Sequence, residues 1–301
     1  WEGNNGLMYN ITCNDNKGIS SGDSSSNGGT ICLTGDNVKI EKSSFSETYA
    51  KIAGGAIFAT GNNITICGSS FTKGNVSYYI EETGKNYANG GGALYAFGNN
   101  TNVLNCIFED NSGRQGGSLY VQGNNATVNM SSFDSGYSYD DGAALYVAGQ
   151  NGKLYNSNFN HNTAGDDGGA IYWEGDGGVI YNITCNDNSG ISSTGTSNGG
   201  TICLTGSNVT VRKSHFGQTY AKIAGGAIFA TGNYINITDS SFDMCYVEQN
   251  APVSGKNYVN GGGALYAFGN NSNIINCTFS RANGREGGIV YIQGNNVTIE
   301  I

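Results

Sequence analysis

Hydrophobic and polar positions along the chain follow a short repeated pattern. Each period opens with a Gly-Gly-small-aliphatic element, first at Gly28 and last at Gly287. Counted from its first glycine, position +3 is aliphatic, position +12 is Ile, Val or Leu, and position +17 is usually Phe. Short alternating runs with Gly and Asn between them are typical of β-strands joined by turns. The pattern therefore predicts a strand, a Gly-Asn turn, a second strand, and a third short strand or loop.

The spacing of these elements favours a solenoid. Successive elements lie mostly 25 or 26 residues apart, with intervals of 31 and 37 residues where insertions occur. A propeller blade needs about 40 residues, and a leucine-rich repeat would carry its own Leu and Asn signature. A parallel β-helix fits, because equivalent residues of successive coils stack at about 4.8 Å. We therefore predict an all-β parallel β-helix of roughly eleven coils, about 50 Å long.

A longer repeat contains the shorter one. Trp1-Glu2-Gly3 recurs as Trp173-Glu174-Gly175, and from Gly28 to Gly123 the chain repeats at an offset of 171 residues. We therefore divide a single continuous rod, 1–301, into a first copy, 1–172, and a partial second copy, 173–301. Because the sequence starts and stops within a copy, we expect it to be an excerpt of a longer tandem array.

Stacking assigns each position of the period to the interior or the surface. Phe at +17 is predicted to form an interior ladder of offset rings, and positions +3 and +12 are predicted to form interior aliphatic ladders. Gly at +7 is predicted to provide a turn at positive φ. Position +4 alternates with +3, so we predict an outer stripe of aromatic residues that could bind a partner. The stripe consists of Phe58, Tyr95, Tyr120, Tyr146, Tyr172, Phe229, Tyr266 and Tyr291.

Composition excludes several classes of protein. The chain has 49 Gly and 42 Asn but one Pro and no Gly-X-Y period, so it is not a collagen. It has no apolar run of about 18 residues, so we expect no membrane insertion in this segment. A hydrophobic content of 38% is enough to bury a core. The net charge of −9 argues against a nucleic-acid partner.

The repeated Gly-Gly-Ala-Ile/Leu elements carry a resemblance. Together with Phe-Glu-Asp-Asn at 108–111 and Phe-Asn-His-Asn at 159–162, they resemble the adhesin-like cell-surface proteins of methanogenic archaea. They are also similar to the chlamydial polymorphic outer-membrane proteins. The resemblance implies a right-handed β-helix that is displayed at the cell surface. It identifies no anchor and no receptor.

An enzyme is the rival interpretation from a different class. Gly165-Asp166-Asp167 resembles one element of the polygalacturonases, which cleave polysaccharides with paired carboxylates. The other elements of that family have no counterpart, and the histidines are limited to His161 and His215. We therefore expect no catalytic residues, with a polysaccharide-binding or polysaccharide-cleaving β-helix as the alternative.

Four aspartates are predicted to stack. Asp140-Asp141 and Asp166-Asp167 occupy the same two positions, just before the Gly element, in adjacent coils. Arg114 holds the corresponding place one coil earlier and could pair with Asp140. The cluster is either a solvated turn or a Ca²⁺ site, because clustered carboxylates favour that ion. No other cofactor is expected.

The eight Cys and the many Asn-x-Ser/Thr sequons are relevant to whether the chain is secreted. Repeat partners such as Cys13 and Cys185 are about six coils apart, so buried or half-buried free thiols are expected, although Cys67 and Cys106 lie in adjacent coils and could approach each other. Cys-x-x-Cys spacing is absent, which argues against a metal held by thiolates. A secreted rod with this many sequons is predicted to be a glycoprotein. The sequons begin at Asn10, Asn63, Asn75, Asn99, Asn125, Asn129, Asn182, Asn208, Asn236, Asn270, Asn276 and Asn296.

An 11-residue insertion differs between the copies while its flanks stay identical. Thr72–Thr83 corresponds to Asp243–Ser254, and both are followed by Gly-Lys-Asn-Tyr. Loops on a rigid scaffold often carry binding residues, although an exposed loop also has few packing constraints and can vary for that reason. The candidate binding residues are Tyr78, Tyr79, Glu81, Glu82, Tyr246 and Glu248.

These observations predict a non-catalytic, extracellular structural or adhesive rod at the cell surface. Its expected partners are further copies of itself in a fibre, other cell-surface proteins, or glycans. A self-assembling filament and a displayed adhesin both fit the sequence.

Overall fold

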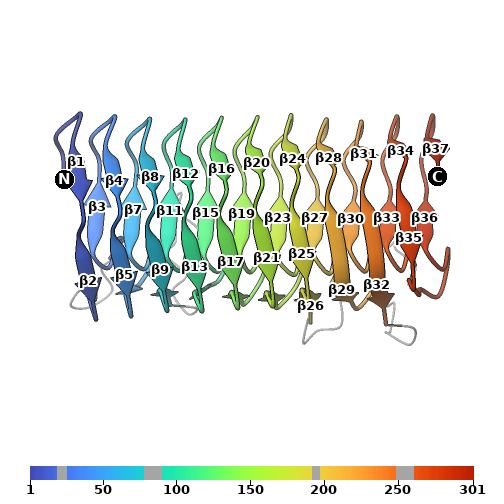
Figure 1. The fold of residues 1–301 in the computed structure, drawn as a ribbon, viewed down its shortest axis with the longest axis horizontal. Coiled ribbons are helices and arrows are strands. Elements are labelled where there is room, and N and C mark those ends of the chain that lie inside the picture. Colours follow the sequence, from blue (N-terminus) through green and yellow to red (C-terminus); the bar gives the residue numbers. More distant parts are fainter. Residues whose placement is uncertain (19–25, 78–89, 192–196, 249–260) are drawn as a thin grey trace.

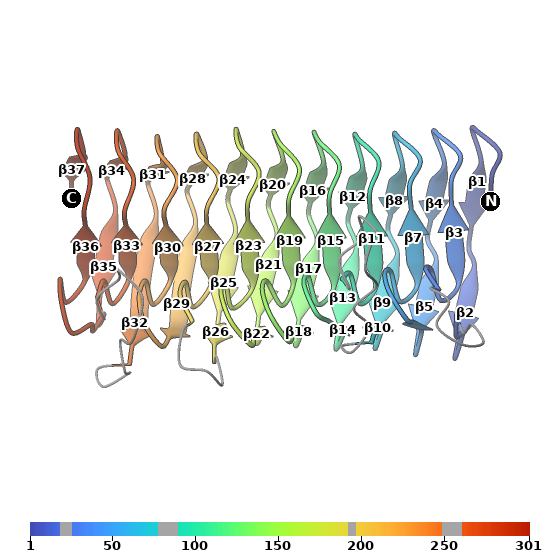
Figure 2. The same cartoon turned by 180° about the vertical axis from the view of Figure 1, so that it is seen from behind.

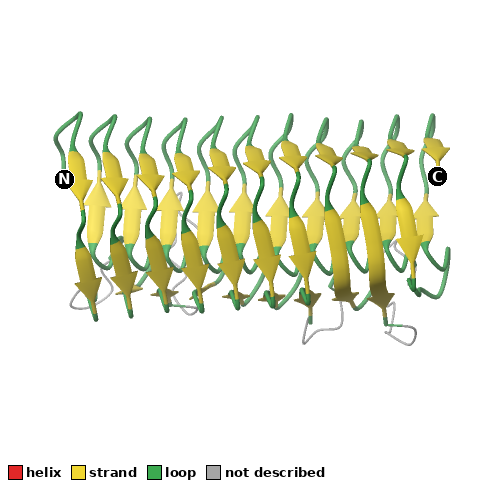
Figure 3. Cartoon of the chain, in the orientation of Figure 1, coloured by secondary structure: helices red, strands yellow, loops and turns green. Residues whose placement is uncertain are grey.

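A computed structural model describes residues 1–18, 26–77, 90–191, 197–248 and 261–301. In these ranges every helix or strand assigned is a β-strand, as Figure 3 shows. The chain forms a right-handed parallel β-helix whose coils follow one another along one axis, from the N-terminus at one end to the C-terminus at the other (Figures 1 and 2). The predicted fold is confirmed. No helix in the described ranges is long and apolar enough to cross a bilayer.

The first sheet contains the strands around position +12. Its central residues, such as Ile40 paired with Ile66, are buried, and all its strand pairs are parallel. Its strands are β1 (Leu7–Tyr9), β4 (Lys39–Glu41), β8 (Thr65–Cys67), β12 (Asn102–Leu104), β16 (Thr127–Asn129), β20 (Lys153–Tyr155), β24 (Val179–Tyr181), β28 (Thr210–Arg212), β31 (Asn236–Thr238), β34 (Asn273–Ile275) and β37 (Thr298–Glu300).

The second sheet contains the strands around position +17 and a row of shorter strands that follow them. The two rows join where β29 pairs with both β25 and β26. The +17 strands are β2 (Thr12–Asn14), β5 (Ser44–Ser46), β9 (Ser70–Thr72), β13 (Ile107–Glu109), β17 (Ser132–Asp134), β21 (Asn158–Asn160), β25 (Thr184–Asn186), β29 (His215–Ala221), β32 (Ser241–Val247) and β35 (Thr278–Ser280). The short row is β6 (Tyr49–Ala50), β10 (Asn75–Val76), β14 (Ser112–Gly113), β18 (Tyr137–Ser138), β22 (Thr163–Ala164) and β26 (Ser189–Gly190).

The third sheet contains the strands that follow the Gly-Gly elements. Each strand places positions +3 and +5 toward the central core and position +4 on the opposite face. Its strands are β3 (Ile31–Leu33), β7 (Ile57–Ala59), β11 (Leu94–Ala96), β15 (Leu119–Val121), β19 (Leu145–Val147), β23 (Ile171–Trp173), β27 (Ile202–Leu204), β30 (Ile228–Ala230), β33 (Leu265–Ala267) and β36 (Val290–Ile292).

The predicted Phe ladder fills the corner of the core beneath the second sheet. Phe71, Phe108 and Phe133 are at most 1% exposed. The Phe71 and Phe108 ring centroids lie 4.9 Å apart, and those of Phe108 and Phe133 lie 4.6 Å apart. Stacked aromatic pairs contribute about 0.5–1.5 kcal/mol each beyond the area they bury. The ladder therefore stabilises the register of the coils along the axis.

A buried asparagine at position +20 explains the Phe-x-x-Asn element. Asn162 is fully buried; its Nδ2 donates to the Phe133 carbonyl at 3.2 Å, and its Oδ1 accepts from the Gly136 N–H at 2.9 Å. Asn111 repeats both bonds two coils earlier, to the Phe71 carbonyl and the Gly74 N–H. Each asparagine therefore satisfies buried backbone groups of the preceding coil, which would otherwise cost about 1–3 kcal/mol each.

Glycine at position +7 does not provide a positive-φ turn, so that prediction is wrong. A Cβ on Gly149 would lie 1.9 Å from the Gly123 carbonyl oxygen, and one on Gly123 would lie 2.0 Å from that of Gly98. Glycine is required there because successive backbones touch. Positive φ occurs instead at single corner residues such as Asn37 (56°), Lys42 (48°) and Glu47 (52°).

Candidate functional site

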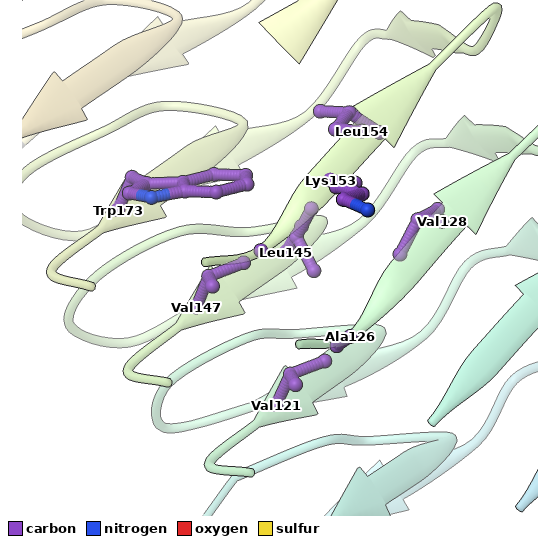
Figure 4. A pocket seen from close by; sticks show the side chains of 9 residues that line it. Val121, Ala126, Val128, Leu145, Val147, Lys153, Leu154 and Trp173 are labelled. Atoms are coloured by element: carbon purple, nitrogen blue, oxygen red, sulfur yellow. The ribbon is translucent and has the colours of Figure 1, made fainter. Parts of the chain in front are cut away.

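The rod interior leaves no room for a ligand beside its largest side chain. Trp173 is 1% exposed, and a Cβ on Gly152 or Gly178 would lie 2.9 or 2.5 Å from its ring. Figure 4 shows the side chains around a void next to Trp173, most of which are aliphatic. The volume of this void is only about 10 Å³. A space of that size holds about one water-sized sphere, so the void is a packing defect. A binding site therefore has to be sought on the outer faces.

The predicted outer aromatic stripe is not exposed. Its members do face away from the central core, and they form two separate clusters outside the third sheet. Within those clusters Tyr95 and Tyr120 stack with centroids 4.7 Å apart. Their exposed fractions are nevertheless small: Phe58 4%, Tyr95 0%, Tyr120 7%, Tyr146 6%, Phe229 3% and Tyr266 0%. Only Tyr172 and Tyr291 are half-buried.

A further layer of chain covers these rings. The residues just before each Gly-Gly element bridge from coil to coil, as Ala53 does to Gly90, and they pass over the aromatic side chains. A Cβ on Gly90 would lie 2.9 Å from the Tyr120 ring. Burial also raises the pKa of the Tyr120 and Tyr146 hydroxyls. The prediction of an adhesive aromatic surface is therefore wrong at the buried positions. The aromatic stripe instead forms a second hydrophobic core outside the third sheet.

The four aspartates lie in the predicted stack, half-buried, and their contacts are divided among different partners. The expected Arg114–Asp140 pair is present, with Nε 2.6 Å from Oδ2. Asp141 Oδ1 accepts from the Asp167 N–H at 3.2 Å. Asp167 Oδ1 in turn accepts from the N–H of Asn198 at 2.8 Å and from its Nδ2 at 3.1 Å. Within the described ranges no three His, Cys, Asp or Glu side chains are grouped to hold a metal ion, and Ca²⁺ binding stays a prediction.

Asp141 has the most perturbed carboxyl group of the stack. Burial raises its pKa from 3.8 to about 6, and the nearby charges of Asp166 and Asp140 add to the rise. The Asp167 N–H and the Gln115 side chain act in the opposite direction. The cluster therefore binds a proton more readily than a solvated turn would.

The sequon asparagines have structural roles at the corners of the coils. Asn63, Asn125 and Asn182 are exposed and have φ between 54° and 58°. Their side chains form coil-to-coil ladders: Asn63 Nδ2 donates to Asn37 at 2.9 Å, and Asn182 Nδ2 donates to Asn156 at 2.8 Å. Asparagine tolerates positive φ better than most residues. Corner geometry thus accounts for much of the sequon pattern, and glycosylation stays a prediction.

All eight cysteines are free thiols: five are buried, Cys13 and Cys67 are half-buried, and Cys32 is exposed, so the expectation of burial is wrong at Cys32. Cys106 is buried, and its Sγ donates to the carbonyls of Leu104 at 3.3 Å and Ile66 at 3.5 Å. Burial raises the pKa of this thiol to about 11. A thiol with a raised pKa is a poor nucleophile at neutral pH. Cys106 therefore acts as a small core residue. It occupies position +15 of the period, where most other coils have a serine, such as Ser131 in the next coil.

The candidate loop residues lie only partly within the described ranges. Tyr78, Tyr79, Glu81 and Glu82 fall outside them. In the second copy Tyr246 is 41% exposed on β32, and Glu248 Oε2 accepts from the Tyr220 hydroxyl at 3.0 Å. Glu248 thus fixes the tyrosine beside it, and Tyr246 remains available for contact with a partner.

An open polar hollow lies on the corner between the first and second sheets. It forms because Gly68 carries no side chain between Lys42 and Asn105, its neighbours in the same corner column. Ser70 Oγ donates to Ser44 Oγ at 3.1 Å along its floor. The hollow carries hydroxyl and amide groups that suit hydrated ligands, but it contains no catalytic grouping of acids and bases.

A group of cations and tyrosines lies on the outer face of the first sheet. We call it the cation–tyrosine patch; it consists of Lys153, Tyr155, Tyr181, Arg212 and Lys213. The patch comes together because Tyr155 pairs with Tyr181 in register and Tyr181 pairs with Arg212. The central residue of each of these strands is buried, so Lys153, Tyr155, Tyr181 and Arg212 point outward. Lys213 follows β28 at the exposed corner of the coil.

Contacts within the patch are close. The Arg212 guanidinium carbon lies 5.0 Å from the Tyr181 ring centroid, and Lys213 Nζ lies 5.8 Å from it. The rings of Tyr155 and Tyr181 meet edge to face at 6.3 Å. We did not predict this patch from the sequence. The sequence feature that could have revealed it is position +13, which points outward beside the buried +12 residue. Tyr155, Tyr181 and Arg212 occupy this position in three successive coils.

No protein-family model matches the chain, and a search of the curated proteins finds no match.

Proposed function

We propose that the chain is a segment of a non-catalytic structural or adhesive rod at the outer surface of a cell. The observation that carries this proposal is the unbroken register of the coils. Equivalent residues pair from Met8 with Ile40 at one end to Ile274 with Ile299 at the other. A solenoid of this kind extends in one dimension and exposes long lateral faces.

The internal ladders supply the stiffness that such a role requires. Backbone hydrogen bonds in three sheets join the coils to one another. The Phe ladder, which is interrupted at Cys185, and the asparagine columns add further contacts between coils. Bending the rod would open these contacts on one side. The resemblance of the Gly-Gly-Ala-Ile/Leu elements to archaeal and chlamydial surface proteins supports the same role and the location outside the cell.

Groups that could support hydrolysis are dispersed. Asp166 and Asp167 belong to the stacked turn, whereas His161 lies between Asp134 and Asp187, with Nδ1 2.9 Å from Asp134. The open hollow at Gly68 is lined by hydroxyl and amide groups and by Lys42, without a pair of carboxyl groups that could act on a polysaccharide. This arrangement supports binding and display over cleavage.

Immunogold labelling of the producing cells tests the proposal. Antibodies against the purified chain are applied to intact cells and, as a control, to permeabilised cells. We expect gold at the surface of intact cells, in rows for a fibre or at scattered points for a displayed adhesin. Labelling only after permeabilisation would overturn the proposal.

A further inference from the structure

We propose that the cation–tyrosine patch binds an acidic polysaccharide, meaning a chain of sugar rings that carry carboxylate groups. The proposal rests on the proposed function in one respect, since it names the ligand class of an adhesive rod. It depends on contacts that can be tested in solution, independently of where the rod is located.

The charge of the patch favours an anionic ligand. The chain carries a net charge of −9, yet Lys153 lies exposed on one coil, and Arg212 and Lys213 lie exposed two coils further along. None of them forms an ion pair with a carboxylate of the described ranges. Asp239, the acidic residue that follows Lys213 in the corner column, accepts a hydrogen bond from Asn276 at 2.7 Å. Three cations are therefore available to an anionic ligand from outside.

The geometry of Arg212 favours a carboxylate group over an anion that cannot accept two parallel hydrogen bonds. The guanidinium lies over the Tyr181 ring, which restricts its orientation. A planar guanidinium can donate two parallel hydrogen bonds to one carboxylate group. Because β28 continues the sheet beside β24, this donor lies next to the tyrosines rather than apart from them.

The rest of the patch suits sugar rings. Tyr155 and Tyr181 are half-buried and combine an apolar ring with a hydroxyl group. Asn182, which donates to Asn156 at 2.8 Å, and Thr210 add amide and hydroxyl groups beside them. A neutral aliphatic partner would leave these polar groups without partners.

The first copy provides an internal comparison. Tyr9 and Lys42 repeat the tyrosine–lysine contact, with Nζ 5.4 Å from the ring centroid. The residue equivalent to Arg212 is Glu41, which pairs with Lys39 at 2.6 Å. In the first copy the central cation is thus replaced by an acid that is already paired. We infer that acidic sugars bind the cation–tyrosine patch and not the equivalent surface around Tyr9 and Glu41.

Calorimetric titration of the purified chain tests this inference. The probes are a hexasaccharide of galacturonic acid, a neutral galactose hexasaccharide and a hexaglutamate peptide, at low salt. Arg212→Glu installs the acid of the first copy. Lys73→Glu is the matched control, because it makes the same charge change at an exposed corner where Glu47 occupies the preceding coil. Circular dichroism checks that each variant is folded, and Arg212→Gln replaces the reversal if it is not.

We expect the galacturonic acid probe to bind, and Arg212→Glu to weaken it about tenfold, the order of effect for losing a charged pair. Lys73→Glu should change the affinity by less than about twofold, and the galactose probe should not bind. The proposal is overturned if the wild-type chain gives no heat with the acidic probe, if both variants weaken it equally, or if hexaglutamate binds as tightly. The last two results would indicate general charge attraction.

Discussion

Replacing Asp141 with Asn should stabilise the rod at neutral pH. The side chain keeps its size and can still accept from the Asp167 N–H, whereas the buried negative charge is removed. Gln115, whose Nε2 lies 3.5 Å from Asp141 Oδ2, can turn its amide to present the oxygen to the new donor. The substitution therefore isolates the effect of the charge.

The sign and size of the effect follow from the pKa of Asp141. Burial raises this pKa from 3.8 to about 6, so between these values the folded chain binds more protons than the unfolded chain. The stability contributed by this carboxyl therefore falls as pH rises from about 4 to 6 and stays low above that range. A rise of this size corresponds to at most about 3 kcal/mol, because each pKa unit is 1.36 kcal/mol.

The assay is urea unfolding of wild type and Asp141→Asn from pH 4 to pH 8. We expect nearly equal free energies of unfolding at pH 4 and an advantage of about 1–3 kcal/mol for the variant above pH 6. Asp110→Asn is the matched control, since Asp110 is exposed and already has φ of 53°. A difference between Asp141→Asn and wild type that does not grow with pH would refute the reasoning.

Three further substitutions test the packing. Gly149→Ala should cost more than about 3 kcal/mol of stability, because its Cβ would lie 1.9 Å from the Gly123 oxygen; Gly288→Ala, with nothing within 4 Å, is the control, and equal melting temperatures would contradict the account. Asn162→Ala should lower the free energy of urea unfolding by about 2–4 kcal/mol, because two buried backbone groups lose their partner; the exposed Asn158→Ala should cost less than about 0.5 kcal/mol. Gly68 has φ of 58°, and a Cβ there would meet only Lys42 within 4 Å. Gly68→Asn should therefore raise the free energy of unfolding by about 0.4–1 kcal/mol. Gly68→Val should lower the melting temperature, because a β-branched residue does not tolerate positive φ.

The sequence was sufficient for the repeat and the main core. Phe108 and Phe133 recur at one position of the period, and burying a large ring in most coils strongly restricts how the coils can stack. The Gly-Gly elements set the register in the same way. Strong, repeated side-chain requirements of this kind are visible in a single sequence.

The corners could not be read from residue types. Lys42, Met130 and Tyr234 all have positive φ, although none of them favours it. The backbone of the neighbouring coils fixes the turn, so the identity of the residue carries little information. Glycine at +7 was misleading for the converse reason: close approach of two backbones requires it, and no unusual dihedral does.

The surface was the least predictable part. Alternation along one strand placed Tyr95 and Tyr120 correctly on the outer face of the third sheet. It could not show that residues such as Ala53 and Gly90 pass over them, because that layer comes from adjacent coils. The cation–tyrosine patch was missed for a similar reason, since Tyr181 and Arg212 are 31 residues apart in sequence but neighbours across the sheet.

Electron cryo-microscopy of material shed or sheared from the surface of the producing cells tests the central proposal most directly. We expect straight rods in that material, with cross-sections matching this β-helix and an axial repeat of about 4.8 Å between coils. Preparations in which antibody to the chain binds no rods, with the chain recovered only from the cell interior, would contradict it.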